Sequence, residues 1–409
     1  VYVAGGKGND QVDVDTTNTS EAVVVATNSG SDTLTFQAFD NISGVQLFGG
    51  EGDDVISAAL GSAGGGLSVF QAVSVAGGRG NDSASLVAIG GEAGYYSGVQ
   101  LLGGSGNDVL SFSAQAGSFT TAGTANGVFG GSGSDTLNIK LDGTLVANGA
   151  SGFVVDLGNE ASGGVINVNV VGSLQGAASF RGSTGADSIS LNNLSAGDVS
   201  GSIISGEAGA DLIGIRANFL AATLIGVQAH GGQGADTITA TLAGGGGYFV
   251  TGGSNILNGG ADADVVAINL VTAAAVTAAS VVGGLGNDSI TVNFIGTGST
   301  IASRGNTAGR NFSIAGGSGD DVIGLVASAS AAVADAEILG GTGNDTISAT
   351  LIQGSVAGLT ANGELGNDSI AFTQTISAGT FSGGTFIGGS GVDSITLSFA
   401  GSGTNNGDY

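Results

Sequence analysis

The sequence predicts an all-β protein built as a single parallel β-solenoid. Three observations predict this class: a glycine-rich turn that closes on an acid returns along the chain, an apolar alternation follows it, and 82 of the 409 residues are glycine. A spacing of about 25 residues is typical of repeat architectures, in which each unit buries its apolar face against its neighbours. We therefore expect about 16 rungs in one continuous repeat domain spanning residues 1–409.

The turn is the most regular part of the repeat. It reads GGSGND at 103–108, GGLGND at 283–288 and GGTGND at 340–345, and the stretch LGNEASGGVINV from Leu157 is a degraded copy that fills a long gap. Glycine at the first, second and fourth places permits positive φ and brings backbone carbonyls inward. The acids that close the turns are Asp10, Asp32, Asp54, Asp82, Asp108, Asp135, Asp187, Asp211, Asp236, Asp264, Asp288, Asp321, Asp345, Asp368 and Asp393.

Short strands are expected on both sides of each turn. After the acid, apolar residues alternate, as in DVLSF at 108–112 and DSITV at 288–292, and period two predicts a strand with one buried face. A second apolar run precedes each glycine pair, as in GVQLFGG at 44–50, and a looser segment lies between the two runs. We therefore expect two or three strands in each rung. No stretch shows helical spacing, and each glycine costs a helix about 1 kcal/mol.

Stacking of the rungs predicts a column of carboxylates. Equivalent strands in a parallel solenoid lie about 4.8 Å apart, so the acids line one edge, where like charges repel unless cations bridge them. Calcium is favoured, because it accepts about six to eight oxygens in flexible geometry, whereas zinc prefers nitrogen or sulfur. The formal charge of -26 matches about 14 or 15 Ca²⁺ ions. All fifteen acids are therefore candidate metal ligands, and the additional turn acids Asp53, Asp262 and Asp320 are expected to tighten binding.

The turn and its following strand, as in GGSGNDVLSF from Gly103 and GGTGNDTISA from Gly340, resemble the haemolysin-type calcium-binding repeat of RTX proteins. The resemblance implies a parallel β-roll that binds calcium between successive coils and is exported in one step from a Gram-negative bacterium. Units of that family are about nine residues long and place two calcium turns in each coil, so the longer period here predicts a calcium row on one edge only. The composition is also similar to that of bacterial surface-layer and extracellular fibril proteins, including calcium-repeat surface proteins of cyanobacteria.

Several classes of function lack their usual signals. The acidic charge would repel nucleic acid and anionic membranes, and no apolar run of about 18 residues predicts membrane insertion. Cysteine is absent, which excludes disulfides and thiolate zinc sites. No GxSxG, HExxH or GxxxxGK[ST] motif occurs, so we do not expect an enzyme.

Individual residues keep two interpretations each. His230 is the single histidine and is expected at the surface rather than in a catalytic site. Asp320 and Asp321 could form a glycosidase pair, but the turn already explains them. Tyr95 and Tyr96 could contact a sugar or a partner protein, or could be partly buried beside a loop.

Basic residues and loops add further alternatives. Lys140, Arg181 and Arg216 are the bases to weigh for a polysaccharide lyase, although the seven bases are scattered. The insertion between Asp288 and Asp321 carries Arg304 and Arg310 and is a candidate for lateral contact or, equally, a neutral loop. The sequons at Asn18 and Asn41 are candidate glycosylation sites.

The leading functional hypothesis is a secreted structural protein of a surface layer, sheath or extracellular filament at a bacterial cell surface. Its expected partners are copies of itself, stacked head to tail and laterally through unprotected strand edges, and cell-surface polysaccharide. Calcium outside the cell would drive folding after export of an unfolded chain. The alternative is a calcium-dependent adhesin stalk or ligand-binding module of a larger RTX protein, and the third hypothesis is a polysaccharide lyase or epimerase fragment.

Overall fold

The computed structural model describes residues 1–409 apart from 17–21, 40, 62–68, 90–93, 121–125, 148–151, 196, 218–222, 244–247, 250–254, 272–274, 277–278, 296–299, 302–311, 329–330, 353, 377–379, 402–403 and 406–409. The chain divides into two compact units, Val1–Gly209 and Ala210–Tyr409, which are considered separately below. The secondary structure of the described residues is β throughout, and none of their segments is a helix that could cross a membrane.

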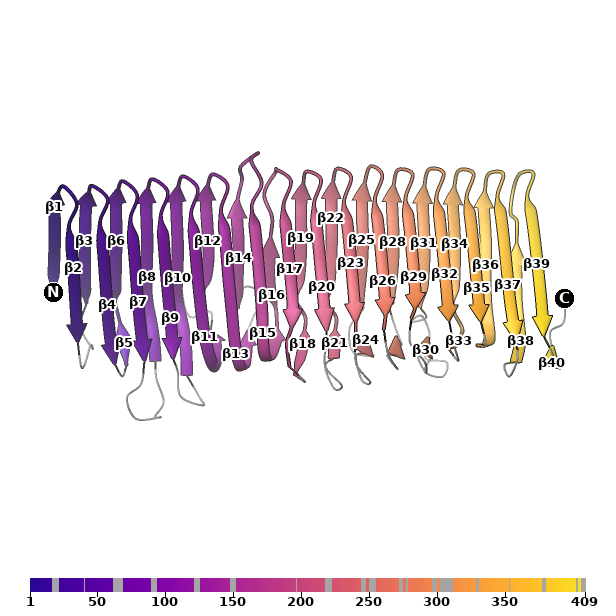
Figure 1. The fold of residues 1–409 in the computed structure, drawn as a ribbon, viewed down its shortest axis with the longest axis horizontal. Coiled ribbons are helices and arrows are strands. Elements are labelled where there is room, and N and C mark those ends of the chain that lie inside the picture. Colours follow the sequence, from indigo (N-terminus) through magenta and orange to yellow (C-terminus); the bar gives the residue numbers. More distant parts are fainter. Residues whose placement is uncertain are drawn as a thin grey trace. The chain divides into compact units, whose positions relative to one another are not determined.

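In the first unit, strands that lead into a turn alternate with strands that leave it, as Figure 1 shows. The leading strands are β1 (Tyr2–Lys7), β3 (Val23–Ser29), β6 (Val45–Glu51), β8 (Val69–Arg79), β10 (Gly94–Ser105), β12 (Gly127–Ser132), β14 (Phe153–Gly158), β16 (Ala178–Arg181) and β19 (Ile203–Ala208). The leaving strands are β2 (Gln11–Thr16), β4 (Thr33–Phe39), β7 (Val55–Gly61), β9 (Ser83–Ile89), β11 (Val109–Thr120), β13 (Thr136–Ala147), β15 (Val165–Gly176) and β17 (Ser188–Asn193). Short strands β5 (Ile42–Ser43) and β18 (Asp198–Ser200) lie between them.

The second unit repeats this plan. Its leading strands are β22 (Gln228–Gln233), β25 (Asn255–Ala261), β28 (Ala279–Leu285), β31 (Ser313–Ser318), β34 (Glu337–Thr342), β36 (Ser355–Leu365) and β38 (Thr380–Ile387). Its leaving strands are β20 (Leu212–Ala217), β23 (Thr237–Leu242), β26 (Val265–Leu270), β29 (Ser289–Phe294), β32 (Val322–Ser328), β35 (Thr346–Ile352), β37 (Ser369–Ile376) and β39 (Ser394–Gly401). The short strands are β21 (Thr223–Ile225), β24 (Tyr248–Phe249), β27 (Ala275–Val276), β30 (Thr300–Ile301), β33 (Ala332–Ala334) and β40 (Thr404–Asn405).

Each strand pairs in parallel with its equivalent in the next coil. Leu34 of β4 lies beside Ile56 of β7, which lies beside Ala84 of β9. The same register aligns Gly50 of β6 with Gly78 of β8. Because the side chains of a strand alternate between its two faces, this register stacks like residues into columns inside the coil.

The core of each unit consists of these columns. In the first unit Leu34, Ile56 and Ala84 of one column are each 1% exposed, and aromatic rings stack in the same way, with Phe70 and Tyr96 centroids 5.3 Å apart. In the second unit Ile213, Ile238 and Val266 are fully buried. Burial of such apolar surface at about 25 cal/mol per Å² is the main force that holds the coils together.

The predicted fold class is therefore confirmed: the protein is an all-β parallel solenoid with about 25 residues per turn. The degraded turn predicted from Leu157 is present and connects β14 to β15. The single continuous domain stays a prediction. Arg304 and Arg310 of the insertion, and the sequon residue Asn18, lie outside the described residues.

Candidate metal centre

The turn between β6 and β7, Gly49–Asp54, shows why its glycines are needed. Gly50 and Gly52 have φ values of +123° and +118°, a backbone region that side chains with a Cβ rarely adopt. A Cβ on Gly50 would also overlap the carbonyl oxygen of Asn28 in the preceding coil. A Cβ on Gly52 would likewise overlap the carbonyl oxygen of Gly30, so both places require glycine for backbone conformation and for the close stacking of coils.

The aspartate that closes each turn ties its coil to the preceding one. The backbone N–H of Asp32 donates to Oδ1 of Asp54 at 2.8 Å, and the N–H of Asp54 donates to Oδ1 of Asp82 at the same distance. The bond recurs through Asp108 and Asp135 in the first unit and from Asp211 to Asp393 in the second. Within each unit, these aspartates form a continuous row, as predicted from the stacking.

The second carboxylate oxygen of these residues is buried. Asp54 and Asp108 are only 1% exposed. Buried Oδ2 atoms without a hydrogen-bond donor belong to Asp10, Asp32, Asp54, Asp82, Asp108, Asp135, Asp236, Asp264, Asp288, Asp321, Asp345 and Asp368. A dehydrated charge without a partner is strongly unfavourable, so each of these oxygens calls for a proton or a cation.

The surroundings of Oδ2 are rich in oxygen. The Oδ2 atom of Asp54 and the carbonyl oxygen of Gly77 border the same point, where a Cβ on Gly49 would lie. The strand pairing skips this first glycine, because Phe48 pairs with Ala76 and Gly50 with Gly78, but Gly49 pairs with no residue of β8. The same oxygen pair, Asp108 Oδ2 with the Gly130 carbonyl, occurs at Gly103. Carboxylate and carbonyl oxygens are the donors that calcium prefers, so the residues fit that ion.

Burial raises the pKa of several carboxyl groups in the row, among them Asp54, Asp108 and Asp264. Desolvation is the largest cause, the backbone N–H of the neighbouring aspartate partly opposes it, and adjacent carboxylates add to it. The pKa reaches about 7 for Asp108 and Asp264, and about 6 for Asp54, Asp236 and Asp321. Without a cation the buried row therefore retains protons at a pH where exposed aspartates are ionised.

One turn satisfies its aspartate differently. Both oxygens of Asp187 accept hydrogen bonds: Oδ2 from the backbone N–H of Ser183 at 2.5 Å, and Oδ1 from the N–H of Gly164 at 2.6 Å. The Ser183 hydroxyl adds bonds to both oxygens at 3.0 and 3.1 Å. Gly164 stands where the neighbouring coils have aspartate, because the turn from Leu157 lacks the acid. The sequence analysis counted Asp187 with the other ligands and missed its serine donor, although serine at the second turn place was visible.

Another substitution changes the turn before Asp32. Thr27 occupies the place of the first glycine, and its buried hydroxyl donates to the carbonyl oxygen of Gly49 at 2.7 Å. This carbonyl is the equivalent of the Gly77 oxygen described above. The turn at Asp32 therefore supplies a donor of its own to one of the oxygens that would face a cation.

The fifth place of the turn forms a second, exposed row that the sequence analysis did not predict. The Asn81 N–H donates to Oδ1 of Asp53 at 2.7 Å, and the Asn107 N–H donates to Oδ1 of Asn81 at 2.8 Å. In the second unit Asp320 and Asn344 are linked in the same way. The additional acids Asp53 and Asp320 therefore lie at the exposed rim, where their charge raises the pKa of Asp54 and Asp321. Their tighter calcium binding stays a prediction.

The other residues singled out from the sequence do not gather into one site. His230 Nε2 lies 3.4 Å from Gln228 Oε1, and burial lowers the His230 pKa. Tyr96 is fully buried and donates to the carbonyl of Gln115 at 2.7 Å, whereas Tyr95 is 47% exposed.

The bases considered for a lyase lie on separate strands. Lys140 pairs with Asp142, and Arg181 pairs with both Asp156 and Glu207. Among the described residues, no three His, Cys, Asp or Glu side chains converge on a common point. A metal in the row would therefore depend on backbone carbonyls as much as on carboxylates.

Comparison with known families agrees with the turn geometry. The model of the RTX calcium-binding nonapeptide repeat (4 copies) matches residues 46–62, 249–267 and 336–350, which contain the Asp54, Asp264 and Asp345 turns. No curated protein matches the chain. RTX calcium-binding repeats imply that the chain binds calcium, and proteins with such repeats are typically secreted or extracellular. On these turns and on the parallel coil that carries them, the three matched segments are similar to the RTX calcium-binding repeat.

Proposed function

We propose that the chain is a secreted structural protein whose calcium-stabilised coils self-associate into a surface layer, sheath or extracellular filament. The observation that carries the proposal is the row of buried Oδ2 atoms without donors. A fold with this row is stable only where cations neutralise it, and calcium is abundant outside cells and scarce inside them. The protein would therefore fold after export.

The turn aspartates would hold the calcium ions, together with the carbonyl oxygen of the first glycine in the next coil. The ion would supply positive charge and link neighbouring coils. The Asp187 turn is the exception, because Ser183 already satisfies its carboxylate. We therefore expect fewer ions than one for each predicted turn.

Self-association is supported by an exposed interior surface on β39. Ile395 and Leu397 stand in line with Ile370 and Phe372 of β37 but are 42% and 38% exposed, whereas those two residues are 1% and 0% exposed. A further β-coil stacked on β39 would cover them, and exposed parallel strand edges recruit such coils. In a sample of residues 1–409 alone, a second copy would supply that coil. A non-catalytic role agrees with this, because two of the three bases considered for a lyase, Lys140 and Arg181, form ion pairs with nearby acids.

The test combines electron microscopy and circular dichroism on calcium-free protein before and after calcium is added to millimolar concentration. We expect β-signal to appear and filaments or sheets to form. Leu397→Asp should fold and remain monomeric, whereas Val55→Asp, at a residue 50% exposed on the outer face of β7, should still assemble. Folded monomers of the wild-type chain at high concentration in calcium would rule out self-assembly and favour the alternative, an adhesin stalk or binding module.

A further inference from the structure

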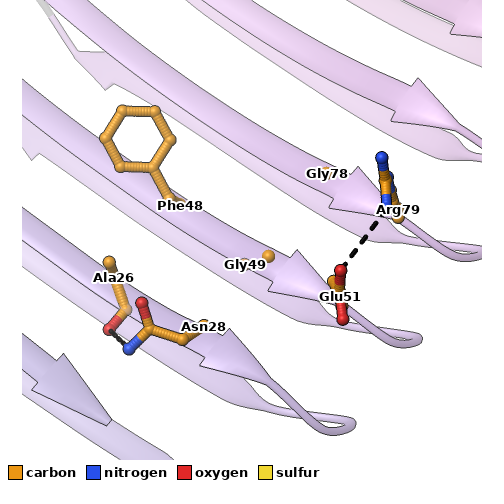
Figure 2. A pocket seen from close by; sticks show the side chains of 8 residues that line it. Ala26, Asn28, Phe48, Gly49, Glu51, Gly78 and Arg79 are labelled. Carbon is orange, nitrogen blue, oxygen red and sulfur yellow. Dashed lines mark hydrogen bonds and ion pairs between the residues drawn. The ribbon is translucent and has the colours of Figure 1, made fainter. Parts of the chain in front are cut away.

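A hollow of about 510 Å³ opens on the outer face of β3, β6 and β8 in the first unit. Figure 2 shows Phe48 and the Glu51–Arg79 pair on either side of the glycine backbone. The lining residues are Ala26, Asn28, Phe48, Gly49, Gly50, Glu51, Gly78 and Arg79. None of them is an aspartate of the buried row.

The register of the coils explains why this hollow forms. Phe48 stands between Ala26 and Ala76 of the neighbouring coils, so only methyl groups flank its ring in that column. Gly50 and Gly78 follow two residues after Phe48 and Ala76 on their strands, and glycine has no side chain to fill the space. Both have positive φ, so the turn itself requires these glycines and keeps the floor of the hollow clear.

The walls offer two kinds of contact. The Phe48 side chain is 36% exposed although it is apolar, and it presents a ring to solvent. Arg79 Nη1 lies 3.4 Å from Glu51 Oε1, and these side chains are 77% and 68% exposed. Hydrogen-bond donors and acceptors of the pair therefore remain available to a ligand.

The exposed Phe48 ring and the Arg79–Glu51 pair together favour one class of ligand over the others. A purely apolar ligand would leave the charged wall unpaired, and a polyanion would meet Glu51 and the charge of -26. A simple cation would be attracted by the ring but opposed by Arg79. A neutral sugar ring has an apolar C–H face for Phe48 and hydroxyl groups for the Arg79–Glu51 pair and Asn28, so it meets both walls.

We propose that the hollow binds a pyranose unit of a neutral polysaccharide, with Phe48 as the stacking platform and Arg79 as the hydrogen-bonding anchor. The inference rests on the proposed function only for the extracellular location that gives access to such a polymer. An open hollow buries little of its ligand, so a single sugar should bind weakly. Copies of the chain arrayed on one polymer would gain affinity through multivalency.

The test uses the full chain folded in calcium, with cellohexaose and dextran as probes. Ring resonances of ¹³C-labelled phenylalanine, assigned to Phe48 by their loss in Phe48→Ala, should shift on addition of at least one probe. Calorimetry should show that Phe48→Ala weakens binding about tenfold and that Phe48→Tyr retains it. Arg79→Ala should weaken it about fivefold. Phe39→Ala is the matched control, since Phe39 is 40% exposed and lies outside the hollow.

Three results would overturn the inference. They are unshifted Phe48 resonances with both probes, unchanged affinity in Phe48→Ala, or preferential binding of polygalacturonate, which is the anionic comparison. Circular dichroism of each variant in calcium separates loss of binding from loss of folding. Folded protein that binds cellohexaose without forming filaments would sustain this site and reject only the proposed assembly.

Discussion

The Asp54–Asp108 stretch and the Asp187 turn of the first unit share a backbone plan but differ in how the carboxylate is satisfied. In both, Oδ1 accepts a backbone N–H from the preceding coil at 2.6–2.8 Å. In the first stretch Oδ2 is buried with no donor, whereas in the second Ser183 donates to it. Of the two carboxylate oxygens, Oδ1 therefore makes the hydrogen bond between coils, and Oδ2 is the one that needs a cation.

The difference at Oδ2 also indicates how a turn of this kind can satisfy its aspartate without calcium. A donor from the second turn place, Ser183, replaces the ion at Asp187. In the turns of the Asp54–Asp108 stretch the second place is glycine, and the aspartate Oδ2 has no donor.

Removal of calcium should abolish the fold. Each site stabilises the native state by about 2.7 kcal/mol when calcium is at about 100 times its Kd, so loss of many sites exceeds the whole stability of an ordinary domain. Far-UV circular dichroism in chelator at about pH 8, where the buried carboxyl groups lose their protons, should show an unfolded chain, and calcium should restore the β-signal. The control is an equal ionic strength of sodium chloride. A chain that keeps its β-signal in chelator would show that the turns need no ion.

Lowering the pH should partly replace calcium in stabilising the fold, because protons also neutralise the buried carboxylates. The pKa of Asp108 and Asp264 is raised to about 7 in the ion-free fold, above the value of 3.8 for an unfolded chain. The folded state then binds more protons than the unfolded one between these values, so its stability falls as pH rises from about 4 to 7. In chelator the chain should therefore show β-signal at about pH 5, and its Tm should fall as the pH rises toward about 7. In saturating calcium the trend should reverse, because protons compete with the ion. A Tm in chelator that rises with pH would contradict the raised pKa values.

Replacing the turn aspartate by asparagine should change the free energy of unfolding in opposite directions in the Asp108 and Asp187 turns. In Asp108→Asn, Oδ1 can still accept from Asp82, and the new NH₂ group faces the Gly130 carbonyl, so the free energy of unfolding at limiting calcium, where about half of the wild-type chain is folded, should rise by about 1–3 kcal/mol. In Asp187→Asn the NH₂ group would face the Ser183 N–H, and stability should fall by a similar amount. Denaturant titration of both variants gives the comparison. Equal changes of the same sign would refute the distinction between the turns.

Ser183→Ala should have the smallest effect. It removes the hydroxyl bonds to Asp187 but leaves the backbone N–H bond, so we expect a loss of about 1 kcal/mol in calcium. Ser132→Ala is a suitable control, because its hydroxyl makes only an exposed bond of 3.5 Å to the Gly104 carbonyl. Urea unfolding should separate the two variants, and identical midpoints would show that the serine hydroxyl does not stabilise the turn.

Much of the fold followed from local patterns. The GGxGxD turns and the alternation after each acid predicted the strands, the parallel stacking and a row of aspartates, because period two and a repeated length leave few other ways to bury the apolar face. The row at Asp54, Asp82 and Asp108 is where stacking predicted it. The family resemblance, carried by the same turns, is confirmed.

Differences between turns that look alike in sequence needed the tertiary structure. Asp187 ends a turn like the others, but only the register shows that Gly164 precedes it in the row and that Ser183 donates to it. The sequence also does not show that Oδ1 accepts the hydrogen bond between coils while Oδ2 lacks a donor, because the side-chain orientation depends on the neighbouring coil.

The sequence by itself determined the coil, its period and the side on which the aspartates gather, since each depends on residue spacing along the chain. Only the tertiary structure decided which carboxylate oxygens lack a donor and where Phe48 faces Glu51 and Arg79 across a glycine floor. These features join residues from different coils, 22 to 28 positions apart. Their contacts depend on the register and on the side chains that the neighbouring coils happen to carry.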